Sequence, residues 1–539
     1  QGSSFTIDSD QYHFNLKRHS SNPNSGINTY WANRGFDAFD ISQDGKIMTL
    51  VANNFAGGQE LVNFVLDTPW DLSTVQPFDY FDSATTGNGS FTRNGDALVA
   101  SSGQSLNNPK YEVPKVNDPN AVRKHSLFSG ALWIGGKDNG GNLKLAAMTY
   151  RQRGSDFWPG PLDTTTSSTE PIRCETYDRL WKITRSDLEE AKEDPSAATE
   201  DIQSWPASFN RITRTGNEAR YLAPYLDVDG APGYNYLNGD HPVLDHRRPA
   251  NENGVSAQPD MFIWFVYNDR GNIHSETQGS PMGLEIQTTA FAYATNDEIN
   301  NMTFYTSQLT NRGFNDIVDC YMGQWVDADL GNYSDDYVGC DVGRSLGYCY
   351  NGDDDDEGVL GYGLNPPTIG VDYFEGPTDN GLELGLSTFM YYNNDSDPIR
   401  GNPDVAIEFY NLLQGKWLGG QNVTFGGNGL GGSQQTKYMF SGGTDPDFPG
   451  QCWDEKSAGN QPADRRFLQS TGPFKMGAGE SQRITTGVVW ARTTSGGAGA
   501  PCNSSAQGSL SILKLASDKA QTLFNNNFKI LDGPDAPDI

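Results

Sequence analysis

The chain is short of the residues that several functions require. It has 38 Lys and Arg against 68 Asp and Glu, for a formal charge of −30. It therefore lacks the basic surface by which proteins bind nucleic acids and anionic membranes. Only six histidines are present and no CxxC occurs, which argues against a zinc site. No run approaches the roughly 18 apolar residues that a membrane span needs. We expect neither nucleic acid as a partner nor membrane insertion.

Turn-forming and aromatic residues are abundant instead. The 539 residues include 61 Gly and 29 Pro, and 12% are aromatic, a composition typical of many short strands joined by turns. We expect an all-β, mainly antiparallel fold of β-sandwich or jelly-roll domains with long loops and few short helices. Continuous or alternating apolar runs predict strands at 260–269, 283–295, 301–312, 437–442 and 472–492.

The chain divides into four zones. Residues 1–105 hold two hairpin-like segments around Asp44-Gly45 and Asn94-Gly95, which predict a small propeller-like β module. Residues 106–125 are polar and broken by proline, as in a linker. We expect a loop-rich β-sandwich core over 126–470, with a short helix capped by Ser186 and Glu189. Residues 471–539 predict strands, an amphipathic helix and a boundary segment. The helix would bury Leu510, Leu513, Leu515, Ala520, Leu523 and Phe524.

Residues 323–341, GQWVDADLGNYSDDYVGCD, carry an unusual density of acids. Alternation of Asp with glycine and turn residues supplies the oxygen ligands that Ca²⁺ prefers. The interleaved Trp, Tyr and Cys indicate a loop folded onto a core, where unneutralised carboxylates are costly. We expect structural Ca²⁺ here; the alternative is a solvated acidic loop. The predicted ligands are Asp327, Asp329, Asp335, Asp336 and Asp341.

A second cation candidate lies in YLDVDGAPGYNYLNGDHPVLD, residues 225–245. Asp227 and Asp229 form a D-x-D-G turn, and Asn238 and Asp240 return oxygens about ten residues later. The alternative is a pair of Asx turns with nothing bound. The acidic run NGDDDDEG at 351–358 is predicted to be a solvated loop, because successive acids point in different directions.

Catalytic motifs are matched only formally. Ser345 lies in a G-x-S-x-G string, but every histidine precedes it, so the triad order of that motif cannot form. The GNGLGG string at 427–432 precedes a strand-like run rather than a helix, which argues against a dinucleotide site. We predict no catalytic and no cofactor-binding residue. Glycoside hydrolysis requires a pair of carboxylates. The candidates are Glu285, Asp297, Glu298 and Glu375, but no spacing singles out a pair.

Export is indicated by two features. The chain begins at Gln1 rather than Met, as expected of a protein whose leader has been removed. Six cysteines, an even number, allow up to three disulfides in an oxidising compartment. Because Cys320, Cys340 and Cys349 lie within thirty residues of one another, we expect at least one disulfide in this central group.

Several strings resemble large surface proteins of Bacteroidota that are exported by the type IX secretion route. They include GALWIGGKDNGGNLKLAAMTYRQRGSDFWPGPLD at 130–163, residues 323–353 with the acidic segment, and PADRRFLQSTGPFKMGAGE at 462–480. The resemblance covers about three quarters of the chain and implies a location outside the cell. In the family, the matching region is followed by repeat domains and a C-terminal sorting signal. The resemblance implies no reaction.

We therefore expect a secreted, cell-surface structural or adhesive protein that is not an enzyme and is stabilised by Ca²⁺. Its sharper form is the subunit of an extracellular filament, sheath or surface layer, with self-association or other surface proteins as partners. The alternative is a glycan-binding or glycan-cleaving module of a polysaccharide-utilising bacterium, for which an aromatic-lined groove would be evidence.

Overall fold

The computed structural model forms two compact units, residues 1–82 and 83–539. It describes residues 111–114, 122, 124–150, 154–207, 217–219, 222–244, 258–502 and 508–528. In the first hundred residues it describes the strand backbones alone. The alternating segment at the N-terminus, residues 1–20, and the closing residues 529–539 lie outside this part of the chain.

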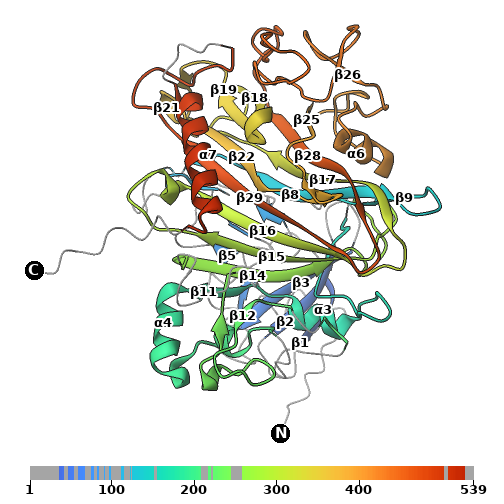
Figure 1. The fold of residues 1–539 in the computed structure, drawn as a ribbon, viewed down its shortest axis with the longest axis vertical. Helices are drawn as coiled ribbons and strands as arrows, with labels where there is room; N and C mark the ends of the chain where they lie inside the picture. Colours follow the sequence, from blue (N-terminus) through green and yellow to red (C-terminus); the bar gives the residue numbers. More distant parts are fainter. Residues whose placement is uncertain are drawn as a thin grey trace, which may run out of the picture. The chain divides into compact units, whose positions relative to one another are not determined.

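The first unit contains an antiparallel four-stranded meander (Figure 1). Its strands are β1 (Phe36–Ile41), β2 (Ile47–Asn53), β3 (Gln59–Leu66) and β4 (Val75–Pro77), paired in chain order. The first predicted hairpin is confirmed, because β1 pairs with β2 from Ile41↔Met48 outward. Strand β5 (Asp82–Ser83) pairs separately with β6 (Ser90–Phe91).

The second predicted hairpin is wrong. Strand β7 (Asp96–Leu98) joins the main sheet of the second unit, where it pairs with β8 (Ser129–Lys137). The unit boundary therefore falls after Asp82 rather than near residue 105.

Two antiparallel sheets build the second unit, which confirms the predicted sandwich-like fold. The six-stranded sheet runs β25 (Thr388–Asn393), β28 (Arg465–Met476), β17 (Ile317–Asp327), β8, β7, with β9 (Leu143–Ala146) also on β8. The nine-stranded sheet has the strands β10 (Trp158–Pro159), β14 (Met261–Asn268), β15 (Leu284–Ala292), β16 (Thr303–Asn311), β29 (Ser481–Ala491), β22 (Thr368–Glu375), β19 (Leu346–Asn351) and β18 (Asp336–Asp341) in this order, with β11 (Trp181–Thr184) also on β14.

Both faces of the nine-stranded sheet are buried. Along β14, Ile263 and Phe265 enter the core shared with the six-stranded sheet, whereas Phe262 and Trp264 enter a second core. The second core is closed by helix α7 (Ser509–Asn525), which lies over β22 and β29 (Figure 1). A strand buried on both faces needs no polar alternation, so the run MFIWFVY is apolar throughout.

The boundary predicted at 470/471 is wrong, because β28 runs from Arg465 to Met476 and is central to the six-stranded sheet. Residues 437–442 form turns and single bridges rather than the predicted strand. Helix α4 (Arg185–Glu193) is capped by Thr184 and Asp187, not by Ser186 and Glu189, since it begins directly after β11.

The remaining helices are α3 (Pro171–Tyr177), α5 (Glu200–Gln203) and α6 (Ala406–Leu413). Helix α6 packs on the six-stranded sheet, where the rings of Phe409 and Trp133 lie 4.8 Å apart. Short two-stranded ladders lie in the loops of the second unit. They pair β12 (Tyr225–Leu226) with β13 (His241–Pro242), β20 (Asp355–Asp356) with β21 (Gly363–Leu364), β23 (Thr378–Asp379) with β24 (Leu382–Glu383), and β26 (Val423–Thr424) with β27 (Gln435–Thr436). No helix in the described ranges is long and apolar enough to span a bilayer.

Candidate functional site

The acidic segment connects the two sheets. Strand β17 of the six-stranded sheet ends at Asp327, the chain turns through residues 328–335, and β18 of the nine-stranded sheet begins at Asp336. Backbone amides hold the turn: Leu330 donates to Asp336, and Gly331 donates to the carbonyl of His125. Gly331 has a φ of +72°, and a Cβ there would collide with the Asp356 carboxylate, so this position requires glycine.

The five predicted ligands do not share one ion. Asp336 and Asp341 stand at opposite ends of the six-residue strand β18, roughly 17 Å apart in an extended chain. Asp341 is instead neutralised by Arg344 at 3.0 Å and Lys514 at 3.1 Å. The close spacing of these acids along the sequence suggested a single loop. Residues 336–341 form strand β18 instead, and its length separates Asp341 from the other acids.

Asp327 and Asp329 are brought together with Asp464, the residue before β28. One carboxylate oxygen of each lies within 4.8 Å of the others. Asp327 is fully buried; its Oδ2 accepts from Tyr150 at 2.6 Å and Arg466 at 3.1 Å, while its Oδ1 has no hydrogen-bond partner. Burial, and then the charge of Asp329, raises the pKa of Asp327 well above its ordinary range.

Asp335 and Asp336 lie on the other side of the turn, near Asp356. Asp336 is fully buried, and burial raises its pKa strongly. Burial, and then the charge of Asp356, raises the pKa of Asp335 to about 7. The Oδ1 atoms of both have no hydrogen-bond partner. Asp356 itself is buried and accepts from the amides of Tyr362 and Asn332, so the acidic run at 351–358 is not the wholly solvated loop that we expected.

The second predicted cluster is assembled in part. Asp227, Asp229 and Asp240 each offer an oxygen within 4.8 Å of the others. Asn238 lies beside them, but its amide nitrogen donates to Asp229 at 2.6 Å rather than offering an oxygen. Both oxygens of the buried Asp240 accept backbone amides, from Val228 and Asn235. Asp227 and Asp229 also accept from the amides of Gly230 and Ala231, the kind of contact that the alternative of two Asx turns predicts.

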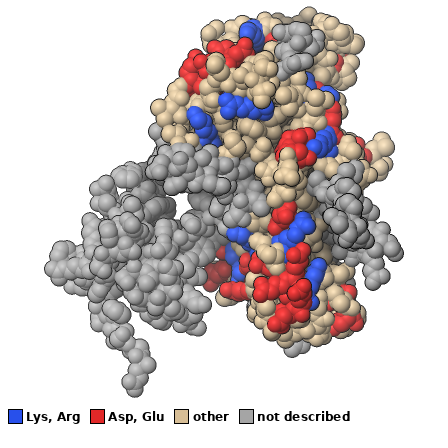
Figure 2. Space-filling model, turned by 90° about the vertical axis from the view of Figure 1, so that its left-hand side faces the viewer, with Lys and Arg blue, Asp and Glu red and all other residues tan. Residues whose placement is uncertain are grey.

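Negative charge also gathers on the surface. Figure 2 shows Asp and Glu side chains over the lower part of the face where helix α4 lies. The exposed acids there are Glu189, Glu190, Glu193, Asp194 and Glu200. Such a surface repels polyanions.

The cysteines pair differently from our prediction. The one disulfide among the described residues joins Cys452 to Cys502, and Cys320, Cys340 and Cys349 are free and buried. Cys320 lies on β17, in the other sheet from β18 and β19. Cys340 is paired with Gly347 and Cys349 with Val338, a diagonal that separates Cα atoms by about 7–8 Å, too far for a disulfide.

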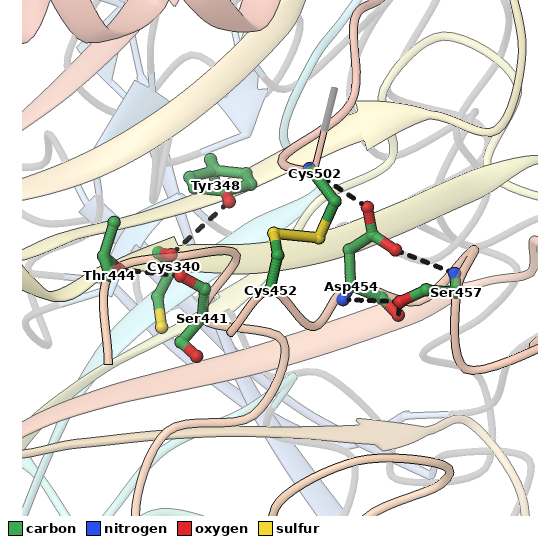
Figure 3. The surroundings of a disulfide bond; sticks show 8 residues. All are labelled: Cys340, Tyr348, Ser441, Thr444, Cys452, Asp454, Ser457 and Cys502. Atoms are coloured by element: carbon green, nitrogen blue, oxygen red, sulfur yellow. Dashed lines mark hydrogen bonds between the residues drawn. A yellow bond between two sulfur atoms is a disulfide. The ribbon is translucent and has the colours of Figure 1, made fainter. Parts of the chain in front are cut away.

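The disulfide anchors residues 440–455, a loop that covers the free edge of β18 and that we call the cap. Three alternate amides of this edge are capped: Val338 donates to Glu455, Cys340 to the carbonyl of Phe440, and Val342 to Thr444. Figure 3 shows Cys452 and Asp454 beside Cys502, whose amide donates to the Asp454 carboxylate. An uncovered strand edge is a template for pairing with another chain, so this cap closes the sheet.

Ser345, the last histidine of the chain and the GNGLGG string all make structural contacts or lie in loops. Ser345 ends a 3₁₀ turn with a φ of 57°, and its hydroxyl accepts from the amide of Leu386. His274 contacts two backbone carbonyls, those of Leu145 and Asp269. The GNGLGG string lies in a loop between β26 and β27.

The carboxylates considered for glycoside hydrolysis are paired with cations. Glu285 lies 2.8 Å from Arg312, Glu375 lies 3.0 Å from Arg483, and Asp297 and Glu298 both contact Lys519. Tryptophans that could stack against sugars are also covered: Trp158 is half-buried, and Trp133, Trp205, Trp264 and Trp325 are buried.

No protein-family model matches the chain, and no curated protein matches it significantly.

Proposed function

We propose that this protein is a non-enzymatic structural or adhesive protein located outside the cytoplasm, at the cell surface or in an extracellular assembly. The observation that carries the proposal is the disulfide Cys452–Cys502, which holds the cap of the β18 edge. Disulfides of this kind persist in oxidising compartments and are rare in the cytosol. The resemblance to exported surface proteins of Bacteroidota supports the same location.

A structural role is supported by the way in which buried charged side chains pair with one another within the fold. Buried ion pairs join distant segments: Arg465 lies 3.0 Å from Glu455 of the cap, and Arg466 lies 3.1 Å from Asp327 on the neighbouring strand. These contacts stabilise the position of the cap and the pairing of β17 with β28. Breaking such a pair is costly, because it leaves a buried charge without its partner.

The test is to locate and image the protein from its native cells. We expect it in the surface or extracellular fraction, accessible to protease on intact cells, and as multi-subunit particles in electron micrographs. A cytoplasmic location, or monomers that cleave or release glycans, would contradict the proposal, and the second result would favour the glycan-directed alternative.

A further inference from the structure

A buried carboxylate oxygen lacks a partner at the point where the chain crosses between the sheets. Asp327 is fully buried, and its Oδ2 already accepts from Tyr150 and Arg466. Its Oδ1 has no hydrogen-bond partner in the structure. Leaving a buried acceptor unsatisfied is unfavourable, and more so for a charged group. Some further group is needed to satisfy it.

Two more carboxylates surround this position, and the available cations do not balance them. Asp327, Asp329 and Asp464 each place an oxygen within 4.8 Å of the other two. Arg466 contacts Asp327 and Asp464, and the nearest charge partner of Asp329 is His125, at 3.9 Å. Among the described residues, Arg466 is the one Lys or Arg within ion-pair distance of these three carboxylates, which leaves a deficit of positive charge.

We propose that Asp327, Asp329 and Asp464 form a binding site for one Ca²⁺ ion. A divalent cation balances the deficit and supplies the missing partner of Asp327. The size of the cluster suits Ca²⁺, since two oxygens on opposite sides of this ion lie roughly 5 Å apart. Three hard oxygen ligands without thiolate or imidazole disfavour softer transition metals. Asp329 and Asp464 are half-buried, which leaves room for water to complete the coordination shell.

The ion would join three parts of the fold. Asp327 ends β17, Asp464 immediately precedes β28, and Asp329 lies in the turn that leads to β18 of the opposite sheet. Strands β17 and β28 are already paired at Asp327↔Arg466. Bound Ca²⁺ therefore fixes the crossing between the sheets, and the expected effect of the ion is on stability.

The expected affinity is modest. One of the three carboxylates is offset by Arg466, so the site has fewer net charges than a high-affinity Ca²⁺ loop. We expect a dissociation constant on the order of 10⁻⁴ to 10⁻³ M, as in extracellular Ca²⁺ modules. The sufficiency of that affinity rests on the proposed extracellular location, whereas the existence of the site does not.

The test uses the full chain, stripped with chelator and titrated with Tb³⁺, whose emission is excited through nearby aromatic rings. Tyr150 donates to Asp327, and its ring lies 5.2 Å from that of Trp325, so the site has its own sensitisers. We expect emission that Ca²⁺ displaces. Asp329→Asn and Asp464→Asn should each weaken Ca²⁺ competition by about tenfold or more, because ligand charge sets affinity.

Two matched controls separate this site from other acids. Asp229→Asn alters the exposed second cluster and Asp355→Asn alters an exposed acid of the 351–358 run; both should leave Tb³⁺ emission and Ca²⁺ competition unchanged. Chelation should lower the melting temperature of the wild type and of both controls, and leave that of the Asp329→Asn, Asp464→Asn double variant unchanged.

The proposal is overturned if Ca²⁺ displaces no Tb³⁺ emission, or if Asp229→Asn abolishes the signal while Asp329→Asn and Asp464→Asn retain it. It is also overturned if chelation leaves the wild-type melting curve unchanged. Failure of the proposed function is a separate result, because a cytoplasmic location would leave the Tb³⁺ titration as predicted.

Discussion

At the scale of single residues, burial makes some acids of this fold harder to ionise than an exposed carboxyl. Asp372 on β22 is buried against helix α7, where the Ser517 hydroxyl donates to its Oδ2 while its Oδ1 has no hydrogen-bond partner. Burial raises the pKa of Asp372 to about 7. The native state therefore binds this proton more tightly than the unfolded chain does, so its contribution to stability falls as pH rises from about 4 to about 7.

The variant Asp372→Asn tests that sign. An amide keeps an acceptor for Ser517 but carries no charge, so the variant should lose this part of the pH dependence. Above pH 7 it should exceed the wild type in free energy of unfolding, by at most about 4 kcal/mol. Urea unfolding of both proteins at pH 5 and pH 8 measures this. A difference between them that is the same at both pH values would contradict the assignment.

At the scale of secondary-structure elements, helix α7 offers a direct test of its buried face. Leu513 is fully buried on the nine-stranded sheet, whereas Leu515, which we expected on the same face, is 67% exposed. Leu513→Ala should cost about 2–5 kcal/mol in free energy of unfolding. Leu515→Ala is the matched control and should change it by less than about 0.5 kcal/mol. Equal effects in denaturant titrations would show that the helix docks by another face.

The cap over β18 gives a second element-scale prediction. Its disulfide joins residues 50 positions apart, and closing such a loop is worth about 4 kcal/mol in the chain-entropy model. Reduction, or the double change Cys452→Ser, Cys502→Ser, should lower the free energy of unfolding by that order. Loss of the disulfide should also raise the rate of hydrogen exchange at Val338, Cys340 and Val342, whose amides donate hydrogen bonds to the cap. Cys174→Ser, at a free half-buried cysteine, is the control.

Unchanged exchange at those three amides after reduction would mean that the cap stays in place without its disulfide. The role assigned to the bond would then be wrong, although the cap itself would stand.

The elements that sequence reasoning located well are those with a strong local pattern. Strands β14, β15 and β16 match the apolar runs predicted for them. Residues 437–442 have the same apolar texture but form no strand, because they lie in the loop that caps β18. Whether an apolar run pairs or packs as a loop depends on distant partners, which local patterns do not contain.

At the scale of the whole second unit, the same limit applies to the candidate site. The spacing of the acids identified Asp327 and Asp329, but Asp464 precedes a strand more than a hundred residues further along the chain and carries no local signal. The pairing of β17 with β28 brings Asp464 close to Asp327. Asp341 looked equivalent to Asp335 and Asp336 in the sequence, but the length of β18 separates it from them.

The measurement that tests the central claim most directly is disulfide mapping of the protein isolated from its native cells. Free thiols are alkylated before denaturation and again after it, without reductant, and the peptides are identified by mass spectrometry. A protein that folds and works outside the cytoplasm should yield a linked Cys452–Cys502 peptide, with Cys320, Cys340 and Cys349 alkylated only after denaturation. Alkylated, unlinked Cys452 and Cys502 in the native protein would contradict that account.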